Sequence, residues 1–228
     1  MNPVSPEQLA GLAGLPILAT ILFYILPSDL QSDRALQFFP QAVTYAALAV
    51  WAARNTDIIV RFGLRPAQLG QGLRWGTATG LILGATNVGI ILWVVPLLGY
   101  DITFLRETPH AQIPTAIMLP WLIVMIALFV EINFRGFLLG RLLVLAERMV
   151  PSLPPSLVSG LAIGATALAF SFDPFMVVTF RHLHWIALWD GLVWGLLWVR
   201  LRNLYVPIIA HAVEVMVMYS ILRKVLIA

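Results

Sequence analysis

Two charged side chains interrupt a long apolar stretch near the middle of the sequence. Glu131 and Arg135 lie within a run that is apolar from Ile113 onward. On an α-helix, residues four apart share a face, about 6 Å apart at Cβ, so the carboxylate and the guanidinium can offset each other's loss of hydration. Charges are expensive inside a bilayer, which makes this pair a candidate functional site. A pair of this kind can also simply lock two helices together.

A second polar group lies in the last apolar stretch of the chain. His211 and Glu214 are three residues apart and share a helical face. The histidine can act as a site residue or be a buried side chain that its neighbouring carboxylate satisfies. The positions of the two stretches predict that Glu131 and His211 reach a similar depth in the membrane.

The composition indicates the elements that must position these groups. Hydrophobic residues make up 60% of the 228 residues, charged residues only 11%, and the mean hydropathy is +0.90. We therefore predict an all-α, polytopic transmembrane helical bundle that forms one integral domain over residues 1–228. The sequence contains no cysteine, which excludes disulfides. The 14 basic residues are spread over many loops, so we predict no nucleic-acid partner.

Windows of about 20 apolar residues predict seven spans, with an eighth possible. They cover about residues 9–26, 35–53, 75–98, 113–139, 155–172, 183–199 and 204–222. The region 175–199 is ambiguous between one long helix and two shorter pieces. No cleaved signal peptide is evident. Basic residues then fall mainly on one side of the membrane, which predicts a cytoplasmic N-terminus.

The order of the motifs resembles a known family. Residues 131–139 (EINFRGFLL), 191–197 (GLVWGLL) and 202–212 (RNLYVPIIAHA) together look like the CPBP family of intramembrane proteins, over a core of about residues 113–222. That family includes CAAX prenyl proteases and bacterial bacteriocin-processing and self-immunity relatives. The resemblance implies a membrane-embedded glutamic-type endopeptidase, with Glu131, Arg135 and His211 as its catalytic residues.

Three positions depart from the family's catalytic pattern. The pattern is Glu-Glu-x-x-x-Arg, then Phe-x-x-x-His, then His-x-x-x-Asn or Asp. Here Val130 stands for the first Glu, Pro174 for the histidine of the second motif and Val215 for the final Asn or Asp. Loss of a general base alone costs roughly 10²- to 10⁴-fold in rate, and loss of one oxyanion donor costs roughly 10²- to 10³-fold. Half of the six signature positions are therefore missing.

Other polar residues can be weighed as replacements. Glu214, Asp173 and His184 are the accessory candidates; His184 fits Phe-x-x-x-His by spacing but lies close to the following glycine motif. A metal site built from Glu131, His211, Glu214 and a further histidine has poor ligand spacing. We therefore predict neither a metal nor another cofactor.

Two functions remain. We favour a binding or scaffold subunit that has lost or altered its protease chemistry and docks another integral membrane protein in the lipid bilayer. The alternative is an active intramembrane endopeptidase that cleaves a membrane-bound peptide, with or without a prenyl group. A proton-coupled transporter is a weaker third option, because no paired interrupted helices indicate the repeats of such proteins.

Overall fold

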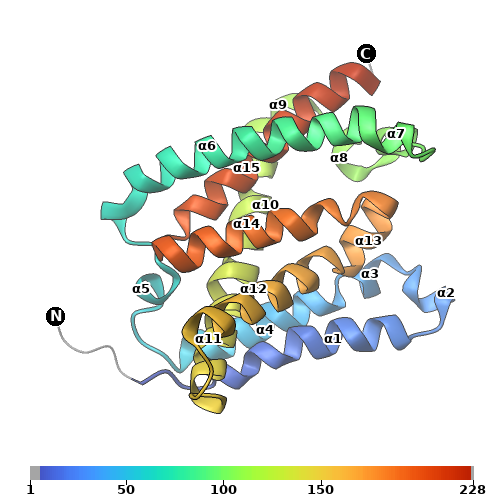
Figure 1. Ribbon diagram of the computed structural model, residues 1–228. Helices are drawn as coiled ribbons and strands as arrows, with labels where there is room; N and C mark the ends of the chain where they lie inside the picture. Colours follow the sequence, from blue (N-terminus) through green and yellow to red (C-terminus); the bar gives the residue numbers. More distant parts are fainter. Residues whose placement is uncertain (1–5, 227–228) are drawn as a thin grey trace. The chain divides into compact units, whose positions relative to one another are not determined.

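The computed structural model describes residues 6–226, which form helices and contain no strand (Figure 1). This confirms the all-α prediction. Contacts divide the chain into two compact units, and each is built from two separate parts of the sequence. The first comprises the described residues up to Arg65 together with Ile132–Arg202. The second comprises Pro66–Glu131 together with the described residues from Asn203. The prediction of a single integral domain stays a prediction.

The first unit contains twelve helical elements within the described residues. They are η1 (Ala10–Ala13), α1 (Gly14–Ile25), α2 (Ser28–Gln31), α3 (Arg34–Gln37), α4 (Phe39–Ala53), α5 (Ile58–Phe62), η6 (Ile132–Leu139), α11 (Gly140–Met149), α12 (Pro155–Ser171), α13 (Pro174–Phe180), η7 (Arg181–Leu183) and α14 (Ile186–Leu201).

The second unit holds the remaining elements. They are η2 (Pro66–Gln68), α6 (Leu69–Gly89), η3 (Ile90–Val94), α7 (Val95–Leu97), η4 (Thr103–Glu107), α8 (Pro109–Gln112), α9 (Thr115–Ile117), η5 (Met118–Leu122), α10 (Ile123–Glu131) and α15 (Tyr205–Leu226).

Three helices of the described chain are long and apolar enough to cross a membrane. They cover Ile58–Leu97, Thr115–Met149 and Tyr205–Leu226, and the bent pair Pro155–Ser171 and Pro174–Leu183 makes a fourth if it is one span. The seven or eight predicted spans are therefore not confirmed. The predicted segments are helical, but some are short: α4 has 15 residues. At 1.5 Å per residue, such a helix is about 22 Å long, less than the roughly 30 Å of a bilayer core.

The core of the first unit is built around aromatic side chains. Trp51, fully buried at the end of α4, stacks on Phe62 with ring centroids 5.5 Å apart and meets Phe137 edge-on at 5.9 Å. The indole Nε1 of Trp198 on α14 donates to the main-chain oxygen of Phe62 at 3.1 Å. These contacts pack helices that are distant in sequence against one another.

A break separates the helices in the ambiguous region 175–199. Helix α13 ends at Phe180, Arg181 adopts a positive φ of 49°, and α14 begins at Ile186. The region therefore forms two shorter pieces rather than one long helix. A second break, a bend of 53°, precedes α13 because Pro174 begins this helix and Asp173 caps it.

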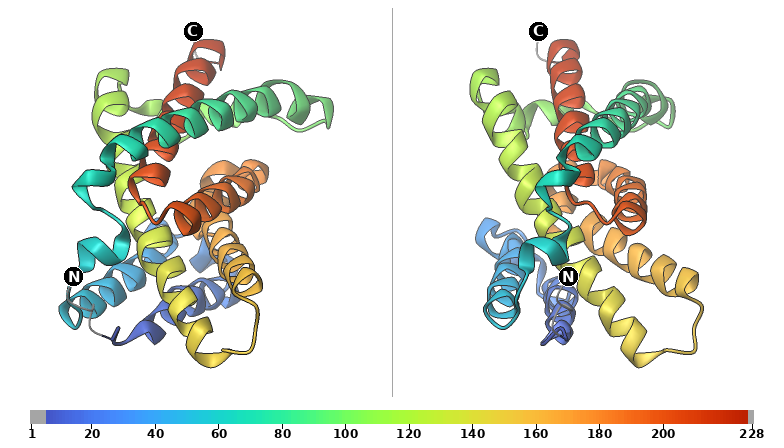
Figure 2. Two further views of the ribbon diagram at one scale, coloured as in Figure 1. Left: turned by 60° about the vertical axis from the view of Figure 1, so that its left-hand side comes forward. Right: turned by 90° about the vertical axis from the view of Figure 1, so that its left-hand side faces the viewer.

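The second unit is organised around α15, with α6 beside it (Figures 1 and 2). The two helices run parallel, because an added Cβ at Gly72 would meet Tyr205 while one at Gly84 would meet Val217. Four glycines at intervals of four face α15 in this way, so the two backbones approach closely. They are Gly72, Gly76, Gly80 and Gly84.

Helix α10 packs on α15 in the opposite direction. The two helices meet at Glu131 and His211, and residue 113, before α10, meets Tyr219 later in α15. The hydroxyl of Tyr219 donates to the main-chain oxygen of Ile113 at 3.1 Å. A small apolar cluster lies between the polar contacts and includes Met118, Ala127 and Ala212. This antiparallel pairing positions the candidate site.

Candidate functional site

The candidate site consists of a carboxylate and an imidazole on facing helices of the second unit. Nδ1 of His211 lies 2.9 Å from Oε1 of Glu131. Glu131 is completely buried and His211 is only 7% exposed. Their separation of 80 residues in sequence means that helix packing, rather than local structure, brings them together. Both residues are candidate site residues by sequence, which also predicts that they lie at a similar depth.

Two local features position Glu131 and His211. Glu131 is the last residue of α10, directly before the chain enters the π-helix η6. His211 lies in the first half of α15, three residues after Ile208 and four after Pro207. Apolar side chains around Ala127 and Ala212 seal the contact between the two helices. The pair is therefore held by a close-packed seam and shielded from water, which strengthens its electrostatic attraction.

A second buried polar pair lies on the same helix. The amide Nδ2 of Asn87 on α6 donates to Oε1 of Glu214 on α15 at 2.8 Å. Asn87 is completely buried and Glu214 is 2% exposed. Because Glu214 is three residues after His211, the two pairs occupy neighbouring positions on α15. Helices α6, α10 and α15 are thus joined by two hydrogen bonds in which a buried carboxylate accepts.

The glycine stripe of α6 makes the Asn87 contact possible. An added Cβ at Gly80 would approach the main-chain oxygen of Ala210 to 2.5 Å, and one at Gly84 would approach Val217 Cβ to 2.9 Å. Any larger residue must therefore push the helices apart. Asn87, Gly72 and Gly76 were not predicted from the sequence, although the repeated spacing of the four glycines is visible there and is typical of close helix packing.

Chemically, a carboxylate bonded to Nδ1 fixes the orientation of the histidine ring. This arrangement directs the other ring nitrogen, Nε2, away from the carboxylate, as in sites where histidine takes a proton from water. The same bond also satisfies two polar groups that would otherwise be costly to bury. The geometry alone therefore fits two roles: a Glu–His pair that acts as a general base, and a structural hydrogen bond that holds two helices together.

Arg135 lies in the first unit, on the π-helix η6. It is completely buried, and its guanidinium carbon lies 4.7 Å from the ring centroid of Phe170 and 5.0 Å from that of Trp194. Such contacts stabilise a desolvated cation by about 2 kcal/mol. A Cβ added at Gly191 would lie 3.2 Å from Nη2 of Arg135, so this glycine leaves room for the guanidinium. The sequence predicts α-helical geometry at Arg135, whereas the structure has i→i+5 bonding, which changes the angular spacing of residues 132–139.

The two remaining accessory candidates have structural contacts in the first unit. Asp173 caps α13, where its Oδ1 accepts from the main-chain N–H of Phe175 at 3.1 Å and from Nε2 of Gln41 at 2.7 Å. His184 is half-buried; its Nδ1 lies 2.7 Å from the main-chain oxygen of Arg181, and its ring meets Phe172 at 5.2 Å. Their proposed accessory role stays a prediction.

The three departures from the family's pattern occupy apolar or structural positions. Val130 is partly exposed on α10, and Val215 packs against the apolar cluster of the second unit. Pro174 is buried at the first position of α13. None of these side chains can move a proton or donate a hydrogen bond. Within residues 6–226, no group of three or more histidine and carboxylate side chains is arranged as a metal site.

A family model described as type II CAAX prenyl endopeptidase Rce1-like matches residues 112–217. No curated protein and no solved structure matches the chain. The matched residues include Glu131, Arg135 and His211, together with all of α10 and the first part of α15. Over residues 112–217, the chain is therefore similar to the Rce1-like family of CAAX-protease-type membrane proteins.

Proposed function

We propose that this protein is a membrane-embedded binding or scaffold subunit that keeps the helical core of its family and has lost or altered the protease chemistry. The enclosure of the Glu131–His211 pair carries the proposal: Glu131 is 0% exposed and its Oε1 is bonded to His211. A general base must contact the water that it activates. A carboxylate enclosed between two helices is instead well placed to hold those helices together.

The residue types around the pair support the same role. Val130 replaces a carboxylate directly before Glu131, and Val215 adds to the apolar packing rather than to the polar site. Because Val130 and Pro174 stand at the family's catalytic positions, the site has neither the second carboxylate nor the second histidine there. The Glu131–His211 and Asn87–Glu214 bonds then serve as internal locks that fix α6 and α10 against α15.

A partner would dock on the apolar outer faces of these helices. Large apolar side chains are exposed along the second span, among them Trp121 at 68% and Phe129 at 48%. Such faces suit lipid or another integral membrane protein, because both present apolar surfaces. We propose a second integral membrane protein as the functional partner.

One observation favours a second candidate, an intramembrane endopeptidase that acts on membrane-associated or prenylated peptides. The 2.9 Å contact between Nδ1 of His211 and Oε1 of Glu131 is the geometry in which a carboxylate orients a histidine for proton transfer. In this role Glu131 and His211 together act as the general base, and Arg135 helps position the segment that follows Glu131.

Purification from the native membrane in a gentle detergent, followed by mass spectrometry, tests the two roles. A scaffold should retain a stoichiometric membrane protein and should not cleave a prenylated peptide. Glu131→Gln should then weaken assembly, while Glu147→Gln, which changes an exposed carboxylate, should not. Peptide cleavage that Glu131→Gln abolishes without loss of fold would refute the scaffold role and establish the endopeptidase.

A further inference from the structure

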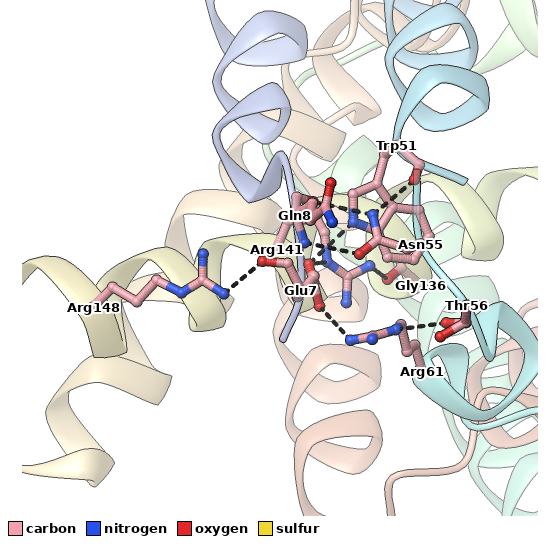
Figure 3. Close-up of polar contacts among 9 residues, drawn as sticks. All are labelled: Glu7, Gln8, Trp51, Asn55, Thr56, Arg61, Gly136, Arg141 and Arg148. Atoms are coloured by element: carbon pink, nitrogen blue, oxygen red, sulfur yellow. Dashed lines mark hydrogen bonds and ion pairs between the residues drawn. The ribbon is translucent and has the colours of Figure 1, made fainter. Parts of the chain in front are cut away.

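A separate polar cluster lies in the first unit (Figure 3). The carboxylate of Glu7 forms ion pairs with Arg61, at 3.3 Å from Nη1, and with Arg141. It also accepts from the indole Nε1 of Trp51 at 3.1 Å. Arg148 donates from Nη2 to the main-chain oxygen of Glu7 at 2.8 Å. We call Glu7, Arg61, Arg141 and Arg148 the arginine cluster.

Positive charge exceeds negative charge in this cluster. The guanidiniums of Arg61 and Arg141 contact the one carboxylate, and that of Arg148 contacts the main chain of the same residue. The side chains of Arg61 and Arg141 are only 10% and 3% exposed. The neighbouring acidic residues in sequence, Asp57 and Glu147, are exposed to solvent. Excess charge in a poorly hydrated site is unfavourable unless an anion compensates it.

The burial of Arg141 shows that the cluster is an ordered site. Its guanidinium carbon lies 4.1 Å from the ring centroid of Trp51, and Nη1 donates to the main-chain oxygen of Gly136 at 3.2 Å. The aromatic ring supports one face of the guanidinium and fixes its plane. The segment of Glu7 is also fixed, because the main chain of Gln8 exchanges two hydrogen bonds with the side chain of Asn55.

The cluster lies where apolar helices end. Trp51 is near the end of α4, Arg61 lies on the short α5 that follows, and Arg148 is in the last turn of the span Thr115–Met149. Glu7 lies a few residues before the first apolar helix. The ends of membrane helices lie at the level of the lipid headgroups, where tryptophan and arginine are enriched.

We propose that the arginine cluster binds the phosphate of an anionic phospholipid headgroup. Arginine's planar fork matches phosphate oxygens in pairs, and basic pockets between membrane helices are known sites for anionic headgroups. Arg148 is exposed and uses Nη2 to bond Glu7, so its remaining N–H groups can meet a phosphate at the mouth of the cluster. Glu7 is the anion that the chain itself supplies, and the lipid phosphate offsets the charge that remains.

This role predicts opposite effects for two neutralising substitutions. Arg148→Gln removes a phosphate donor and should weaken the binding of phosphatidylglycerol about three- to tenfold, measured by native mass spectrometry in detergent. Glu7→Gln removes the competing carboxylate. It should lower the melting temperature in neutral detergent and strengthen the response to phosphatidylglycerol. Arg200→Gln, which removes an exposed charge at the end of α14, is the matched control and should change neither result.

Phosphatidylcholine and inorganic phosphate, each added in place of phosphatidylglycerol, test whether the bound anion is a lipid headgroup or a free phosphate. Stabilisation by phosphatidylglycerol but by neither of these two supports the proposal. Equal stabilisation by inorganic phosphate would identify a free-anion site and refute the lipid assignment. Two further outcomes would overturn the proposal. One is unchanged phosphatidylglycerol binding in Arg148→Gln; the other is a Glu7→Gln variant that the lipid stabilises no more than it stabilises the unsubstituted protein. A purely structural cluster would behave in this way, because it gains nothing from the headgroup.

Discussion

Glu131 and His211 are joined by a 2.9 Å contact between Oε1 and Nδ1, across two antiparallel helices, at a position where the carboxylate is inaccessible to solvent. The contact satisfies a buried acid and a buried imidazole at once. Breaking it from one side leaves the other group buried without this partner, which costs more than the bond itself contributes.

The first prediction concerns the strength of this contact. Glu131→Leu removes the acceptor for His211 and should lower the free energy of unfolding by about 2–4 kcal/mol. Glu131→Gln keeps an acceptor oxygen of similar shape and should cost clearly less. Chemical unfolding in detergent micelles, followed by circular dichroism, measures both. Equal losses for the two variants would mean that the hydrogen bond contributes little.

The second prediction concerns the glycine stripe on α6. Gly80→Ala places a methyl group 2.5 Å from the main-chain oxygen of Ala210, so the helices must separate and the free energy of unfolding should fall by about 1–3 kcal/mol. Gly70→Ala on the same helix is the matched control, since a Cβ there meets nothing within 4 Å. Alanine favours helices over glycine, so the control should be neutral or slightly stabilising. A Gly80→Ala variant as stable as the control would contradict the close packing.

The third prediction treats Asn87 and Glu214 as a coupled pair. Asn87→Leu leaves a buried carboxylate without its 2.8 Å donor, and Glu214→Leu leaves the amide without its acceptor. Each single substitution should cost about 1–3 kcal/mol of unfolding free energy. The double substitution should cost much less than their sum, because neither polar group remains to be satisfied. Additive losses in this double-mutant cycle would show that the two side chains act independently.

The fourth prediction concerns His110, which lies between the spans Ile58–Leu97 and Thr115–Met149. Burial lowers the pKa of His110 from its usual value of 6.5. The folded protein therefore binds this proton less readily than the unfolded chain. Stability should be complete above pH 6.5 and should fall as the pH decreases from 6.5 toward the lowered pKa.

Unfolding measured between pH 5 and pH 8 tests this pH dependence. His110→Gln removes the titrating group and should flatten the profile below pH 6.5, by up to about 1.4 kcal/mol per pH unit. His184→Gln is the control, because this residue is also a histidine outside the three long spans. Identical slopes in the His110 variant and the unsubstituted protein would assign the pH dependence to another group.

Local sequence properties were sufficient to predict several parts of this structure. Hydropathy identified helices near residues 113–139 and 204–222, because a run of apolar residues is visible without any knowledge of packing. The charges at Glu131 and Arg135 and the histidine at 211 stood out for the same reason: polar groups are costly where their neighbours are apolar. The ordered motifs around them predicted the family that residues 112–217 match.

Contacts between distant residues required the tertiary structure. The pairing of Asn87 with Glu214 spans 127 residues, and that of Glu7 with Arg141 joins the start of the described chain to α11. Helix lengths also came only from the structure: α4, for example, has 15 residues and is shorter than a bilayer core requires.

The sequence by itself thus determined that this protein is all-helical and which of its residues could take part in chemistry, since those follow from residue type and spacing. Only the tertiary structure decided which of these residues meet. It paired Glu131 with His211, enclosed Arg135 between Phe170 and Trp194, and used Asp173 as a helix cap. The physical reason is that burial and hydrogen bonding depend on the register between helices. The α6 glycines help to set this register, because they lack a Cβ and so allow close packing on α15.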